Sequence, residues 1–319
     1  MRDPGPRSNR TPGDPGNTQM GLDGGSTAAE QHVQIESVFG LSTPCAGTLA
    51  LCPAPTAQQH LAAFPAGSCV VVYDTAARRQ ISVLRSQATS RPVAVVAWSP
   101  DGSHLVAGEA AGAGGAATVH IWNAESGACT QQLRGQHRHG VGSLCFSPDG
   151  KLLASTGASH DGQVCLWDWR SGQLLARQGL QGEAAAAVFT EDGLNLVAAG
   201  KGTYKVWAIS EGSGSSGGAP LAAGARARGG GGGGLVLTSK PVTLKDHRAA
   251  AFVAVAAAPA PAGQLPGSCG VYALTAAGVL VLMRATARMP DKAVDLQVRS
   301  AEIMRHQPSN HTIHHASGQ

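Results

Sequence analysis

Two sequence features recur along this chain at nearly the same interval. The turn motif Ser-Pro-Asp-Gly fills 99–102 and 147–150, and a weaker version, Thr-Glu-Asp-Gly, fills 190–193. Apolar runs that end in an aromatic residue recur as well, and they close at Tyr73, Trp122, Trp167 and Trp207. Both features repeat about every 45 residues, and a fixed period of this size is the signature of a repeat architecture.

Each repeat predicts a small antiparallel meander. In the clearest unit, residues 141–178, short apolar runs are separated by Pro-Asp-Gly, His-Asp-Gly and Ser-Gly, which are turn sequences. Pro fixes φ in such turns, and Gly accepts backbone angles that other residues avoid. Four strands in about 40–45 residues, with Trp-Asp at the end of the third strand, predict one blade of a WD40 β-propeller. The predicted fold class is therefore all-β.

We expect about five four-stranded blades between residues 36 and 298. The Pro/Gly-rich residues 1–35 predict a disordered arm, and the polar, His-rich residues 299–319 predict a tail. Residues 210–234, rich in Gly, Ser and Ala, predict a flexible insert in the fourth blade.

Five blades are fewer than the roughly seven with which WD propellers commonly close, so we expect an incomplete or open propeller. The outer faces of its first and last blades would lack neighbours. The apolar runs 48–52 and 70–73 of the first blade, and 279–283 of the last, would then be half exposed.

One repeat carries a complete set of polar residues at the positions where WD repeats hold a structural hydrogen-bonded network. The set consists of His137, Ser155, Asp161 and Trp167. A buried Trp needs an acceptor for its N–H, and a satisfied polar network fixes the geometry of a blade. We therefore expect these four residues to have a structural role.

The other repeats are less complete. Arg91 and Pro92 stand where the His belongs in the repeat that ends at Trp122, and the repeat that ends at Trp207 lacks both His and Asp. We expect packing alone to hold those blades. The turns are marked by Asp101, Asp149 and Asp192.

Composition and spacing argue against several classes of function. The formal charge is +4 without a block of like charges, so nucleic-acid or membrane binding is not favoured. The seven cysteines form no Cys-x-x-Cys pair, and several lie in apolar runs, which predicts buried free thiols in a cytoplasmic protein. No His, Cys or carboxylate set has catalytic or metal-binding spacing, so we expect no enzyme, no metal and no cofactor.

Several segments between residues 36 and 298 resemble the N-terminal region of the JNK-binding WD-repeat scaffolds, the mitogen-activated protein kinase-binding protein family. They include "PAGSCVVVYD", "HDGQVCLWDW" and "DKAVDLQV". The resemblance implies kinase-pathway components as partners and an association with the cytoskeleton or spindle. Such scaffolds continue with further blades, which implies that this chain is a fragment of a larger scaffold.

The leading hypothesis is a non-catalytic scaffold that binds other proteins through the faces of its propeller. Its specificity would lie in turns such as 108–117 and 157–162, because loops held on a rigid frame carry recognition. One alternative is an RNA-associated WD protein, which the mild basicity suggests. Another is a propeller enzyme, although the positions around its central channel are mostly Ala, Val, Gly and Ser.

Overall fold

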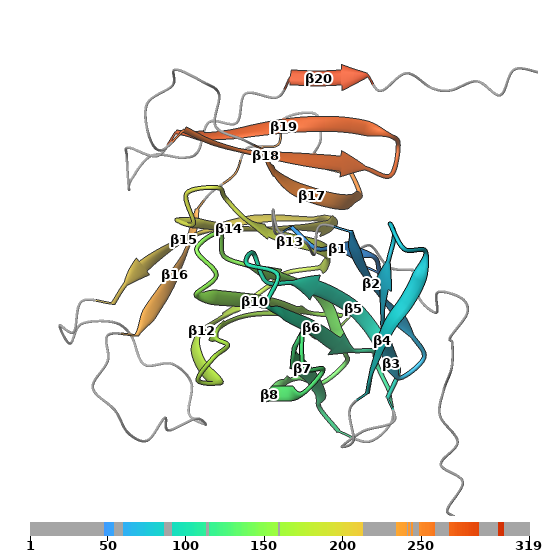
Figure 1. The fold of residues 1–319 in the computed structure, drawn as a ribbon. Coiled ribbons are helices and arrows are strands. Elements are labelled where there is room, and N and C mark those ends of the chain that lie inside the picture. The colour runs from blue at the N-terminus through green and yellow to red at the C-terminus, as the bar shows by residue number, and fades with distance from the viewer. Residues whose placement is uncertain are drawn as a thin grey trace, which may run out of the picture. The chain divides into compact units, whose positions relative to one another are not determined.

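The computed structural model describes residues 48–53, 60–85, 91–112, 115–158, 160–212, 234–240, 242, 244, 249–258, 268–286 and 299–302 (Figure 1). Within these residues the elements of secondary structure are all β-strands, and they form five antiparallel sheets of four strands each. The prediction of an all-β fold with about five four-stranded blades is confirmed.

The strands follow one another in chain order. Sheet one contains β1 (Ala50–Leu51), β2 (Leu61–Ala66), β3 (Cys69–Asp74) and β4 (Arg79–Arg85). Sheet two contains β5 (Val93–Trp98), β6 (His104–Glu109), β7 (Ala117–Asn123) and β8 (Cys129–His137). Sheet three contains β9 (Val141–Phe146), β10 (Leu152–Gly157), β11 (Gln163–Asp168) and β12 (Gln173–Gly179). Sheet four contains β13 (Glu183–Phe189), β14 (Asn195–Lys201), β15 (Thr203–Glu211) and β16 (Leu235–Lys240). Sheet five contains β17 (Phe252–Ala258), β18 (Ser268–Thr275), β19 (Val279–Thr286) and β20 (Arg299–Glu302).

The second and third strands of sheets two, three and four pair in the same register. The tryptophan of each third strand lies opposite a leucine, in the pairs Leu105 with Trp122, Leu153 with Trp167 and Leu196 with Trp207. Because side chains alternate between the faces of a sheet, an equal register puts all three indoles on the same face of their sheets.

Consecutive sheets pack against one another through these indoles. Trp122 packs into a cluster with residues of sheet one, Trp167 into one with sheet two, and Trp207 into one with sheet three. Sheet five packs against sheet four, where β17 lies beside β13 and β14 (Figure 1). Phe252 of β17 contacts the ring of Tyr204 in β15. Sheets two, three and four therefore each pack against the sheet before them through the tryptophan of their third strand, whereas sheet five uses Phe252 of its first strand.

The predicted open arrangement agrees with the strand pairing. In the described part of the chain, strands pair within their own sheet, apart from one bridge between Lys201 of sheet four and Ala251 before sheet five. No described strand joins sheet five to sheet one, so the sheets are not closed into a ring.

The exposure predicted for the end blades is only partly correct. Leu49 and Leu51 are 55% and 65% exposed, as expected for the first run of blade one. The prediction is wrong for Val70, Val71 and Val72, which are buried. It is also wrong for two residues of the last blade, because Val281 and Met283 are buried in the cluster that contains Phe252.

Two predicted boundaries differ from the structure. β15 continues through Glu211, and the Gly212 N–H donates to the Gly234 carbonyl at 2.8 Å, so the hairpin extends into the segment expected as an insert from 210 to 234. Residues 213–233 lie outside the described residues. β20 lies within the segment expected as the tail, 299–319, and residues 287–298 before it lie outside the described residues.

Candidate functional site

The four predicted network residues lie in hydrogen-bonding contact. The indole N–H of Trp167 donates to Ser155 Oγ at 2.9 Å, and Ser155 Oγ lies 2.8 Å from His137 Nε2. His137 Nδ1 lies 2.7 Å from Asp161 Oδ2, and the backbone N–H of Arg138 donates to Asp161 Oδ1 at 2.8 Å. All four side chains are buried. β8, β10, β11 and the turn after β10 thereby meet at one point.

The hydrogen bonds match a neutral His137 that carries its proton on Nδ1. In that form Ser155 Oγ accepts the indole proton and donates its own hydroxyl proton to Nε2, and Nδ1–H donates to Asp161. Burial lowers the pKa of His137, while the hydrogen bond and charge of Asp161 act in the opposite direction without overcoming it. A neutral His137 uses both of its ring nitrogens, so the network leaves this His without a free nitrogen.

Sheet two buries a second polar pair that the sequence reasoning missed. His120 Nε2 on β7 lies 2.9 Å from Glu109 Oε1 on β6, and the Thr118 N–H donates to Glu109 Oε2 at 2.9 Å. Both side chains are almost fully buried, and the His120 ring lies 5.5 Å from that of Trp122. The expectation that packing alone holds this repeat was therefore wrong. The sequence did offer a signal for this contact, because Glu109 and His120 are titratable residues within two mostly apolar strands.

Glu109 occupies the strand position that is Gly157 in sheet three. The shared register places Ala107 with Ser155, and hence Glu109 with Gly157, two residues further along. A Cβ added at Gly157 would clash with the carboxylate of Asp161. The carboxylate that the turn supplies in sheet three therefore comes from the strand itself in sheet two.

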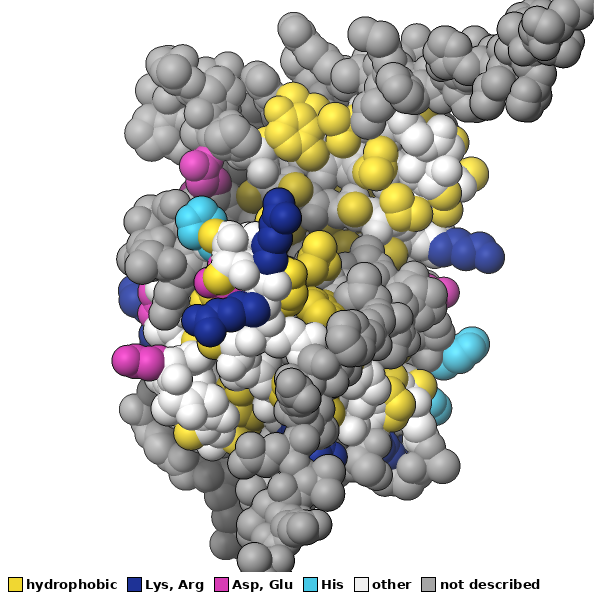
Figure 2. Space-filling view, turned by 45° about the vertical axis from the view of Figure 1, so that its right-hand side comes forward, with side chains coloured by type: hydrophobic (Ala, Val, Ile, Leu, Met, Phe, Trp, Pro, Cys, Tyr) yellow, Lys and Arg dark blue, Asp and Glu magenta, His cyan; other side chains and the backbone are white. Residues whose placement is uncertain are grey.

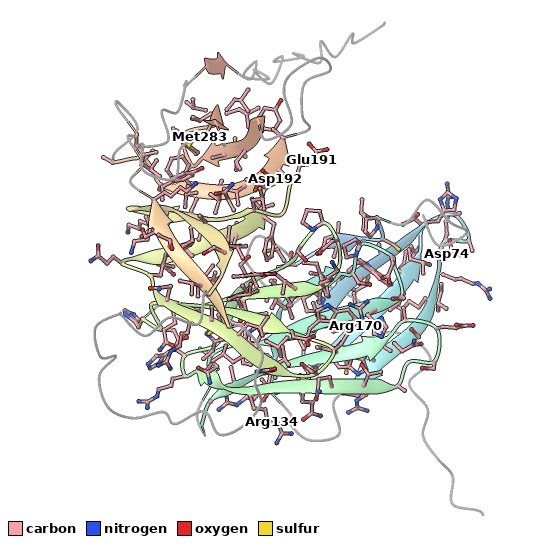
Figure 3. The ribbon with its side chains drawn as sticks, turned by 90° about the vertical axis from the view of Figure 1, so that its left-hand side faces the viewer. Asp74, Arg134, Arg170, Glu191, Asp192 and Met283 are labelled. Atoms are coloured by element: carbon pink, nitrogen blue, oxygen red, sulfur yellow. The ribbon has the colours of Figure 1, made fainter. Side chains whose placement is uncertain are left out.

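The three predicted turn aspartates make the same hydrogen bonds in three sheets. Asp101, Asp149 and Asp192 each accept from the hydroxyl two residues earlier, at 2.5, 2.6 and 2.6 Å, and from a backbone N–H two residues later. These hydrogen bonds fix the turn that joins the first strand of each sheet to the second. Figure 3 shows Asp192 and its neighbour Glu191 at the right-hand end of their sheet, and Asp74 at the right-hand end of sheet one.

Hydrogen bonds lower the pKa of two of these aspartates. Burial acts to raise the pKa of Asp101, but hydrogen bonds from Ser99 and Ser103 outweigh it and hold this pKa at about 2. The Ser147 hydroxyl lowers the pKa of Asp149 in the same way, against a smaller effect of burial. Asp101 and Asp149 therefore stay ionised in more acidic solution than an ordinary Asp does.

Two of the repeat-marking aromatic residues, Trp122 and Trp207, lie in the packing between the sheets. Trp122 and Trp207 are buried, whereas Tyr73 is partly buried. Trp169, which the sequence reasoning did not single out, is also buried, and its N–H donates to the Gly150 carbonyl at 3.0 Å. Arg170 lies over the same ring, 4.1 Å from its centroid.

The described cysteines are free, as expected, but two of them are not fully buried: Cys145 is partly buried and Cys129 is exposed. Cys52, Cys69 and Cys165 are buried, and burial raises the pKa of Cys165 to about 12. Cys129 is exposed, because it begins the outer strand β8. Cys45 lies outside the described residues, and nothing is described of the Cys269 side chain.

A cavity of about 540 Å³ opens where sheets two to five meet. Its wall comes from the starts of the first strands and the ends of the second strands, and includes Ala94, Val141, Ala158, Ala184 and Phe252. Glu183 and Lys201, which pair across β13 and β14, are its charged lining residues. The size is that of a ligand pocket, and the wall is mostly apolar.

The predicted specificity turns contribute to this cavity. Ala110 and Ala111 come from the turn 108–117, and Ala158 comes from the turn 157–162. The Ala158 N–H donates to the Gly140 carbonyl at 2.8 Å, which ties the second turn to the start of β9. Figure 2 shows apolar and basic side chains next to one another on one face of the molecule.

Among the described residues, no helix is long and apolar enough to cross a membrane. No group of three or more His, Cys, Asp or Glu in the same residues is arranged to hold a metal ion.

Comparison with known proteins identifies the repeats. Residues 78–123 and 127–168 match the WD40 family, described as "WD domain, G-beta repeat". The chain therefore contains WD40 repeats, as the spacing of Ser-Pro-Asp-Gly and Trp predicted. Each matched unit begins near the fourth strand of one sheet and ends with the third strand of the next. The sequence repeat is thus offset by one strand from the structural sheet.

Several relatives share parts of this chain. Centriole proteome protein 16 of Chlamydomonas reinhardtii is 32% identical over 44% of the chain and 8% of its own length. Cilia- and flagella-associated protein 52 of the same alga is 30% identical over 47% of the chain and 24% of its own length. Mitogen-activated protein kinase-binding protein 1 of Mus musculus is 29% identical over 56% of the chain and 11% of its own length.

The match to mitogen-activated protein kinase-binding protein 1 confirms the resemblance to that family noted from the sequence, although other WD proteins match as well. In all three comparisons the chain spans a quarter or less of the relative's own length.

Proposed function

We propose that this chain is a non-catalytic WD40 scaffold that binds other proteins at the cavity where sheets two to five meet. The cavity carries the proposal, because it is a concave, largely apolar site built by several repeats together. A rigid frame of strands holds the turns around it, which is the arrangement that suits recognition.

The buried polar groups support a structural role over a catalytic one. His137 is hydrogen-bonded to Ser155 and to Asp161, and Asp161 also accepts a backbone N–H. Glu109 is hydrogen-bonded to His120 and likewise accepts a backbone N–H. We propose that these groups fix the geometry of the sheets, as a satisfied buried network does. A catalytic His or carboxylate must instead reach a reacting atom in a cleft.

The names of the relatives support a place at the cytoskeleton. Two of them are named for the centriole, or for cilia and flagella, and one is named for binding a mitogen-activated protein kinase. We propose a cytoskeleton-associated scaffold within a larger assembly, with kinase-pathway proteins as one class of partner.

Capture from a cell extract, with quantitative mass spectrometry, tests the proposal. Ala111→Trp places a large side chain at the cavity from an exposed turn, so it should block binding without disturbing the core. Ala77→Trp is the matched control, because Ala77 lies in an exposed turn away from the cavity.

We expect one set of proteins to be retained by the natural sequence and by Ala77→Trp, and lost with Ala111→Trp. Equal retention by all three would show that the cavity is not the binding site. Retention of nothing above background would contradict the scaffold function itself.

A further inference from the structure

The topology of the sheets sorts their turns into two ends. In an antiparallel sheet of four strands, the first-to-second and third-to-fourth connections lie at one end. The second-to-third connection and the link to the next sheet lie at the other. The cavity is lined by starts of first strands and ends of second strands, so this second end is where sheets two to five meet.

Charge follows the same division in sheets two to four. At the first end, the described turns and strand tips carry acidic residues that include Asp101, Glu125, Asp149, Asp168, Glu191 and Asp192. The basic residues described there are Lys151 and Arg170. We call this the acidic end.

At the cavity end, basic side chains outnumber exposed acidic ones. Its described turns and strand tips hold Arg91, Arg138, Lys201 and Lys240. Its acidic residues are Glu109, Asp161 and Glu183, and two of these are buried against histidines. Glu183 is therefore the described carboxylate that this end exposes. We call it the basic end.

We propose that the cavity at the basic end binds an acidic segment of a partner protein, with one large apolar side chain of that segment inserted between the sheets. This inference rests on the proposed function and names the chemistry of the partner. The wall of Ala, Val and Phe252 provides room for an aliphatic or aromatic side chain. Lys201 at the lining and Arg138 on the neighbouring turn attract the acidic flanks.

A peptide fits these observations better than an RNA strand does. Single-stranded RNA is held by bases stacking on exposed aromatic side chains along a basic groove. The aromatic residue that lines this cavity, Phe252, is 2% exposed, and most of the wall consists of alanine. Small apolar residues leave a hole for a side chain but present no stacking platform.

Fluorescence anisotropy with the full chain and labelled synthetic peptides tests the proposal. The first probe is a twelve-residue peptide of Asp, Glu and Gly with one central Leu. The second replaces Leu by Gly, the third replaces every acidic residue by Lys, and a fourth probe is oligo-uridine RNA. Three point variants complete the set: Lys201→Glu, Arg138→Glu and, as the matched control at the acidic end, Lys151→Glu.

We expect the Leu-containing acidic peptide to bind, and the Gly version to bind roughly 10- to 100-fold more weakly because one buried Leu is lost. Each charge reversal at the basic end should weaken binding by about fivefold, and high salt should weaken it further. Lys151→Glu should change nothing, although it breaks the contact of Lys151 with Asp149.

The inference is wrong if the Lys-containing peptide or the RNA binds more tightly than the acidic peptide. It is also wrong if none of the probes binds while the capture experiment still loses its partners with Ala111→Trp, since the scaffold function would then stand without this chemistry. Binding that ignores both Lys201→Glu and Arg138→Glu would place the acidic peptide elsewhere.

Discussion

The second and third strands of sheets two and three pair in the same register, yet the two sheets bury different polar groups at corresponding strand positions. In sheet three, Ser155 and Asp161 enclose His137, which arrives from the last strand of the sheet before. In sheet two, Ala107 replaces the serine, and Glu109 bonds to His120 of the neighbouring strand. One network joins two sheets, whereas the other lies within one.

The comparison teaches that the buried carboxylate–histidine contact can be supplied from different places in the chain. Gly157 leaves room for a carboxylate from the turn, and Glu109 brings a carboxylate of its own. Both solutions bond the carboxylate to a backbone N–H as well as to the imidazole. In each case a histidine near the tryptophan is held in a fixed orientation, which a buried polar group requires.

The largest expected effect concerns the buried tryptophan that each of the two sheets has on its third strand. Trp122→Ala and Trp167→Ala should each lower the free energy of unfolding by about 3–5 kcal/mol, because each removes a large buried side chain. Urea denaturation followed by circular dichroism measures both. If either substitution leaves the midpoint unchanged, that tryptophan does not belong to the core.

Glu109→Ala should cost about 3 kcal/mol, because it leaves His120 and the Thr118 N–H buried without their acceptor. Glu125→Ala is the control, since Glu125 lies in an exposed turn of the same sheet. A double-mutant cycle with His120→Ala should show a coupling energy of about 1 kcal/mol or more. Additive effects would mean that the pair does not act as a unit.

Ser155→Ala should cost about 1–3 kcal/mol, since it strands the N–H of Trp167 and the Nε2 atom of His137. Ala107→Ser introduces the same hydroxyl at the matching position of sheet two. There the histidine is already bonded to Glu109, so no gain in the free energy of unfolding is expected. A stabilising Ala107→Ser would show that sheet two can hold the network of sheet three.

The smallest expected effect is a pH dependence specific to sheet three. Burial lowers the pKa of His137 below its ordinary value of 6.5. The unfolded chain therefore takes up a proton at this residue near pH 6.5 while the folded chain does not, and stability falls as the pH drops below that value.

Urea denaturation between pH 7.5 and 5.5 measures this dependence. The fall should be steeper for the natural sequence than for His137→Gln, and His139→Gln, an exposed neighbour, should leave it unchanged. Equal slopes for the natural sequence and His137→Gln would mean that His137 is protonated equally in both states.

Much of this protein follows from its sequence alone. The spacing of Pro-Asp-Gly turns and of Trp122, Trp167 and Trp207 determines the strands, their order and the repeat, because turn chemistry and alternation act over a few residues. The network of His137, Ser155, Asp161 and Trp167 was also within reach, since these residues occupy fixed places in one repeat unit.

Only the tertiary structure brought Glu109 to His120, and the starts and ends of strands from four sheets to one cavity. Glu109 and His120 are eleven positions apart across a turn of irregular sequence, so their contact depends on a register that local preferences do not set. The cavity and the opposite charges of the two ends depend on how whole sheets pack. Packing of this kind follows from apolar contacts between residues distant in the chain, which no local pattern contains.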